Sequence, residues 1–275
     1  MKIDLLTLYN YRNYNNLNLK LSSNINIFTG FNAQGKTNII EAIYFSSLGI
    51  SHRTRTEGDL ILWGKDEASI NVKFSKRDIN SILKIILKKN KRKELNFNGE
   101  IIKQKDLPGL LTMILFSPED LMLIKGSPLL RRRFIDIELS QISRIYYNEL
   151  VQYNRLLLQR NNLLKKIREN KKLIPMLDTW DEQIAKTAAF IVEKRLRGIE
   201  KLSKLAQKIH YEISQKMEIL NIRYNIHNYK NEALNSFDDL FNFYIQALSK
   251  YRDNDIYRGS TRIGPHRDDI DFFIN

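Results

Sequence analysis

The chain has 275 residues, of which 43% are hydrophobic and 28% charged, a composition that excludes a disordered protein and supports one large domain or two lobes. It contains no cysteine, which excludes disulfides, zinc knuckles and thiol chemistry. The net charge of +14 favours a polyanionic partner such as nucleic acid, although an AT-rich genome would also enrich lysine. With no apolar run long enough for a membrane span and no signal-peptide pattern at the N-terminus, we expect a cytoplasmic protein without membrane contact.

Short strands are predicted over most of the first 125 residues. Alternation of polar and apolar residues indicates strands at 3–9, 17–21, 25–28, 69–75, 82–88 and 94–98. The last two flank a basic turn, residues 89–93, which suits a hairpin tip. Such a turn is either simply solvated or in contact with a phosphate backbone, and the sequence leaves both readings open.

A phosphate-binding loop of the form G-x-x-x-x-G-K-[ST] follows the third predicted strand and precedes a helical pattern that ends near Gly49. In this setting backbone N–H groups and the positive end of the helix converge on one concavity, where a triphosphate fits. We expect Lys36 to contact the β- and γ-phosphates of ATP and the Thr37 hydroxyl to hold Mg²⁺. The predicted ATP-binding residues of the loop are Gly30, Phe31, Asn32, Ala33, Gln34, Gly35, Lys36 and Thr37.

Helices dominate the following region. Ser117 and Ser127 each precede a proline, a pattern typical of capped helix starts. Pro175 separates two long apolar stripes at helical spacing, and a strand over 219–226 and a helix over 237–251 follow. The chain closes with a predicted strand over 270–275. We therefore predict an α/β fold with an ATP-binding lobe (1–125), a helical lobe (126–254) and a return strand to the ATP-binding lobe (255–275).

Six groups of residues in this order resemble the RecF family, bacterial recombination-mediator ATPases built on an ABC/SMC-type head. They are residues 10–14 (NYRNY), 30–43 with the phosphate loop, 51–54 (SHRT), 116–121 (FSPEDL), 125–134 (KGSP and RRRF) and 264–269 (GPHRDD). The phosphate loop alone would fit many ATPases, whereas the order and spacing of all six groups are specific. The resemblance runs the length of the chain.

This resemblance implies an ATP-dependent homodimer that binds single-stranded and double-stranded DNA at junctions and gaps. It implies a role in loading recombinase during gap repair, in replication and in the SOS response, with RecO and RecR as partners. Arg12 would approach the nucleotide from the N-terminal strand. The predicted DNA contacts form two groups. The first is Arg53 and Arg55, beside His52. The second is Arg131, Arg132 and Arg133, for which pairing with Asp136 or Glu138 is an equal alternative.

Two motifs expected after residues 264–269 in this family do not occur in the sequence: a Ser-Gln-Gly-Gln-Gln-Arg-like signature and an apolar strand ending in paired acids. The sequence therefore suggests a shortened family member with weak ATP binding and negligible hydrolysis. Two alternatives remain: a DNA-binding fragment without nucleotide dependence, and the ATPase lobe of a nuclease of the overcoming-lysogenisation-defect type. DNA retention that depends on ATP, or cleavage that depends on metal, separates them.

Overall fold

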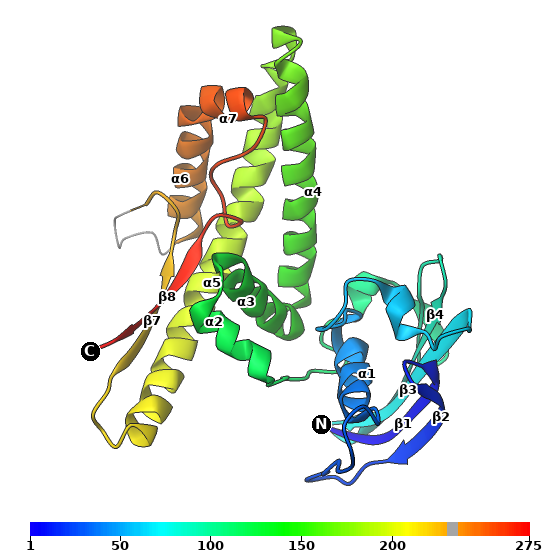
Figure 1. The fold of residues 1–275 in the computed structure, drawn as a ribbon. Helices are drawn as coiled ribbons and strands as arrows, with labels where there is room; N and C mark the ends of the chain where they lie inside the picture. Colours follow the sequence, from blue (N-terminus) through cyan, green and yellow to red (C-terminus); the bar gives the residue numbers. More distant parts are fainter. Residues whose placement is uncertain (230–235) are drawn as a thin grey trace. The chain divides into compact units, whose positions relative to one another are not determined.

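The computed structural model describes residues 1–229 and 236–275, and it forms two compact units, residues 1–115 and 116–275 (Figure 1). Each unit buries hydrophobic residues in a core of its own. The boundary precedes the one expected at residue 125. Within the described part of the chain, no helix combines the length and apolar character needed to cross a bilayer.

The first unit contains an antiparallel sheet of six strands in the order β2-β1-β3-β4-β5-β6. Alternate residues of its central strands face the core, as the period of two requires. The β4–β5 pairing confirms the hairpin predicted around the basic turn. The strands are β1 (Lys2–Tyr11), β2 (Tyr14–Lys20), β3 (Glu67–Lys76), β4 (Ile79–Lys88), β5 (Glu94–Phe97) and β6 (Glu100–Ile102).

Helix α1 (Lys36–Leu48) packs with the sheet through Ala42, Ile43 and Phe45, which belong to the same core as the strand residues. It ends at Gly49, whose φ of 68° is accessible to glycine and confirms the predicted stop. Two short 3₁₀ segments, η1 (Glu57–Leu60) and η2 (Gln104–Asp106), complete the unit.

The strand predicted over residues 25–28 does not form. This segment is absent from the six-stranded sheet, and Ile25 and Ile27 are each 80% exposed. Alternation of polar and apolar residues favours a strand, but a strand also requires a hydrogen-bonded neighbour. No described segment pairs with these residues, so the prediction was wrong.

The second unit is mainly helical. The helix predicted after Ser127 is α3, although this serine makes no side-chain cap bond, and Pro175 lies between α4 and α5 as expected. Its helical elements are η3 (Pro118–Leu121), α2 (Met122–Lys125), α3 (Pro128–Ile142), α4 (Arg144–Ile167), η4 (Lys171–Leu173), α5 (Met176–Ile213), α6 (Phe237–Lys250) and α7 (Arg252–Arg258).

A two-stranded antiparallel ribbon of β7 (Leu220–Asn225) and β8 (Asp269–Ile274) also belongs to the second unit. This differs from our expectation that residues 255–275 return to the ATP-binding lobe. The physical reason is local: Ile270 of β8 and Ile222 of β7 share a small core with Ile135 and Ile199 from the helices. The strand therefore buries its apolar side against its own unit.

Two buried arginines hold the segment before β8 in place. Arg195 makes two bonds of 2.9 Å to the Asp136 carboxylate and one of 2.7 Å to the Pro265 carbonyl. Arg160, which is fully buried, binds Asp181 at 2.6 Å and Asp255 at 2.7 Å. Burying these charges is tolerable because each guanidinium is paired and hydrogen-bonded.

Candidate nucleotide-binding site

The phosphate loop, residues 30–37, ends in the first two residues of α1. Gly30 and Gly35 have φ values of 144° and 98°, conformations that L side chains rarely adopt. A Cβ at Gly35 would lie 2.7 Å from the Asn13 side-chain oxygen and from the Tyr14 hydroxyl. Glycine therefore lets the β1–β2 turn approach the loop closely.

Lys36 is the first residue of α1, and its half-buried side chain folds back over the loop. Its Nζ donates to the carbonyls of Gly30 at 2.8 Å and Phe31 at 2.6 Å. Thr37 is exposed in the first turn of the helix. The loop thus combines an ammonium group, a hydroxyl and the N-terminal amides of a 13-residue helix, which fits a triphosphate.

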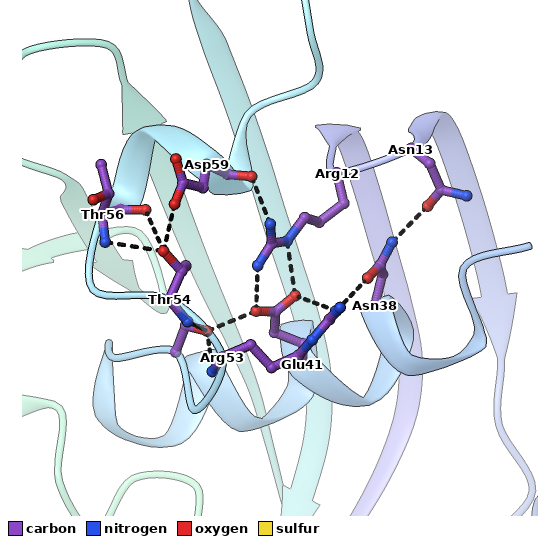
Figure 2. A network of polar contacts seen from close by, with 9 residues as sticks. Arg12, Asn13, Asn38, Glu41, Arg53, Thr54, Thr56 and Asp59 are labelled. Atoms are coloured by element: carbon purple, nitrogen blue, oxygen red, sulfur yellow. Dashed lines mark hydrogen bonds and ion pairs between the residues drawn. The ribbon is translucent and has the colours of Figure 1, made fainter. Parts of the chain in front are cut away.

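Arg12 lies beside this loop and forms an ion pair with Glu41, a residue to which the sequence analysis assigns no role. Its Nε and Nη2 donate to the two carboxylate oxygens of Glu41 at 2.9 and 2.7 Å, and its Nη1 donates to the Asp59 carbonyl at 2.9 Å (Figure 2). The hydrogen bonds that Arg12 donates to the Glu41 carboxylate raise the pKa of Arg12. Arg12 also has a left-handed φ of 53°, which turns the chain from β1 into β2.

Arg53 reaches the same glutamate from the loop that follows α1. Its Nη1 donates to Asn38 at 2.8 Å and to Glu41 at 3.4 Å (Figure 2). Asn38 in turn donates to Asn13 at 2.8 Å. The structure thereby brings Arg12, Arg53 and Asn38 into one hydrogen-bonded network.

These side chains line one wall of a cavity of about 1270 Å³ in the first unit. Basic side chains predominate in its lining over the acidic Glu57 and Asp59, and the almost fully exposed Trp63 adds an aromatic surface. An anionic or aromatic ligand suits such a lining. The basic residues are Arg12, Arg53, Lys65, Lys88, Lys89 and Lys91.

The remaining arginines predicted to bind DNA differ in their surroundings. Arg55 and Arg133 are exposed. Arg131 instead makes a two-pronged pair with Asp269 at 2.7 and 2.9 Å, and Arg132 donates to the Asp268 carbonyl at 2.6 Å. Arg131 therefore pairs with an acid, and that acid is Asp269. DNA contact by Arg55 and by Arg131, Arg132 and Arg133 remains a prediction.

Glu41 could have been found from the sequence by its position. It lies in α1 among Ile39, Ala42 and Ile43, all of which face the core. An acid at such a position requires a buried cation or hydroxyl as partner, and two arginines flank the loop in sequence. Its partners could not be chosen without the fold, because they come from distant segments.

The comparisons with known proteins agree on one family. A family profile described as "AAA domain" matches residues 5–250. The "DNA replication and repair protein RecF" of Clostridium botulinum (strain ATCC 19397 / Type A) is 43% identical over 276 residues, covering 100% of this chain and 74% of the relative. The protein of the same name from Clostridium perfringens (strain SM101 / Type A) is 42% identical over the same shares.

Solved structures lead to the same conclusion. A "recombination mediator protein RecF-ATP" from the RecFOR pathway matches with a TM-score of 0.91 and 31% identity, over 99% of this chain and 74% of that one. A second RecF structure, described with ATPrS, gives a TM-score of 0.93. These matches confirm the predicted ATPase-head fold, and by its sequence and its fold this chain belongs to the RecF family.

Proposed function

We propose that this chain is an ATP-binding protein of DNA repair and replication that binds DNA under the control of the nucleotide. The observation that carries the proposal is the phosphate loop, in which Lys36 begins α1 and its ammonium group folds back onto the carbonyls of Gly30 and Phe31. The identity to proteins described as RecF supports the repair function. The solved relative described with ATP supports the choice of nucleotide.

The residues of the loop have distinct roles in this proposal. Lys36 exchanges its two carbonyl partners for phosphate oxygens when ATP binds, and the loop amides donate to the same anion. Thr37 would hold Mg²⁺ through its hydroxyl, and the ion would neutralise part of the phosphate charge. Arg12 and Arg53 add positive charge beside the loop.

Single-stranded and double-stranded DNA are the proposed macromolecular ligands, in the cytoplasm. The net charge of +14 supports this choice, and the exposed Arg55 and Arg133 are candidate contacts. An ATP-dependent homodimer is part of the proposal, as the resemblance to the RecF family implies. RecO and RecR are the proposed partners, because a solved relative is described within the RecFOR pathway.

The test is retention of the protein on gapped duplex DNA, measured with and without Mg-ATP. We expect ATP to prolong retention of the parent protein but not of a Lys36→Ala variant, which keeps its salt-sensitive basal binding because phosphate-backbone contacts are separate. Equal retention with and without ATP would contradict nucleotide control. Cleavage of the DNA in Mg²⁺ would instead favour the nuclease alternative.

A further inference from the structure

Glu41 is a fully buried carboxylate in the second turn of α1. It follows Thr37 by four residues, so both side chains lie on one face of the helix, one turn apart. Burial alone would raise the pKa of Glu41, but bonds from Arg12 and Ser51 and the charges of Arg12 and Arg53 lower it. The carboxylate is therefore ionised at neutral pH.

This carboxylate also fixes the loop that carries Arg53. Ser51 donates its hydroxyl to Glu41 at 2.6 Å and accepts the backbone N–H groups of Arg53 at 2.9 Å and Thr54 at 3.2 Å. The Thr54 hydroxyl continues the network to Asp59 at 2.5 Å (Figure 2). One acid thus orders the backbone at Arg53 as well as two guanidinium groups.

Two guanidinium groups share the Glu41 carboxylate, and the charge of the nearby Asp59 also acts on Arg12. The Arg53 side chain is 44% exposed and the Arg12 side chain 19%, so the two cations lie on the side open to solvent, while Glu41 is enclosed. Both arginines line the cavity described above, and Glu41 does not.

We propose that Glu41 is a positioning residue for nucleotide binding, which holds Arg12 and Arg53 beside the phosphate loop before the anion arrives. This inference rests on the proposed ATP-binding function. Ordering long side chains at the moment of binding weakens affinity, and a fixed buried partner removes that cost. Glu41 contacts the arginines rather than the nucleotide.

Two effects of Glu41→Gln on ATP affinity oppose each other. Removing a negative charge near the triphosphate favours binding through space, whereas freeing two arginines weakens it. The acid is separated from the cavity by its own partners, so we expect the loss of orientation to prevail. The expected weakening is about tenfold, as for residues that orient metal ligands.

The experiment measures the Kd of Mg-ATP by calorimetry for the parent, Glu41→Gln, Arg12→Lys and the double variant. Glu100→Gln, an exposed acid of β6 in the same unit, is the matched control for loss of one negative charge. If the two substitutions acted independently, their fold-losses of affinity would multiply in the double variant. We expect the double variant to bind Mg-ATP far more tightly than that product, because both changes act through one interaction. Losses that multiply, or a Glu41→Gln variant that binds as tightly as the parent, would overturn the proposal.

Glu41→Asp keeps the inference testable if Glu41→Gln does not fold, as judged by near-UV circular dichroism. Glu41→Asp preserves the negative charge and withdraws the carboxylate by one methylene. Weaker Mg-ATP binding by this variant would therefore show that the position of the carboxylate matters, and unchanged binding would refute the proposal. If the parent protein binds no Mg-ATP at all, the proposed function fails instead. If the parent binds, Lys36→Ala does not, and the Glu41 variants match the parent, only this inference fails.

Discussion

Asp268 and His266 are buried in the second unit, and their contributions to stability change with pH in opposite directions. Burial raises the pKa of Asp268 to about 6 from an ordinary 3.8, and burial lowers the pKa of His266 to about 4 from 6.5. For Asp268 the folded state binds the proton more tightly, so stability falls as pH rises from about 4 to 6. For His266 the unfolded state binds it more tightly, so stability rises from about pH 4 to 6.5.

The two effects are similar in size. At about 1.36 kcal/mol per pH unit, the gap of 2.2 units for Asp268 and that of 2.5 units for His266 each correspond to about 3 kcal/mol. In the parent protein they nearly cancel. Relative to the parent, Asp268→Asn should become more stable by about 3 kcal/mol as pH rises from 4 to 6, and His266→Gln should become less stable by about as much as pH rises from 4 to 6.5.

Urea unfolding at several pH values between 4 and 7 measures these differences. Trp63→Phe leaves Trp180 of the second unit as the only tryptophan, so its fluorescence reports that unit. Both substitutions preserve polar side chains that can bond Tyr224 and Tyr153, the present partners. If the free energy of unfolding of each variant differed from that of the parent by the same amount at every pH, the reasoning would be refuted.

Two further predictions concern the buried ion pair at Arg160 and the phosphate loop. Arg160→Ala leaves Asp255 buried without its cation, so it should destabilise the second unit by about 3–5 kcal/mol and lower Tm in a thermal scan by about 6–20 °C. Lys204→Ala removes an exposed ion pair and should cost at most about 0.5 kcal/mol, so equal Tm shifts for the two variants would contradict the role of burial. Gly35→Ala should weaken Mg-ATP binding at least tenfold by titration, because its Cβ would collide with Asn13 in a strained backbone, and parent-like affinity would contradict the loop geometry.

The sequence predicted what depends on local pattern. The phosphate loop, the hairpin around the basic turn and the break at Pro175 each follow from neighbouring residues, and the structure contains all three. The strand at 25–28 and the destination of β8 depend on which segments pair, and this is decided by contacts far apart in sequence.

The candidate site was predictable to the same extent. The spacing of Gly30 to Thr37 predicts a phosphate loop, whereas the contacts of Glu41 are visible only in the fold, which brings Arg12 and Arg53 to it. Arg131 illustrates the converse: the sequence left DNA contact and pairing with an acid equally open, and the fold supplies Asp269 as its partner. Charge alone does not distinguish a ligand contact from an internal ion pair.

Calorimetric titration of the folded protein with Mg-ATP tests the central claim most directly, with Lys36→Ala as the paired variant. We expect saturable heat with one nucleotide bound per chain for the parent, and loss of that heat for the variant, because Lys36 supplies the cation of the phosphate loop. An absence of heat from the parent, or equal affinity in the variant, would contradict the assignment of this loop as the nucleotide site.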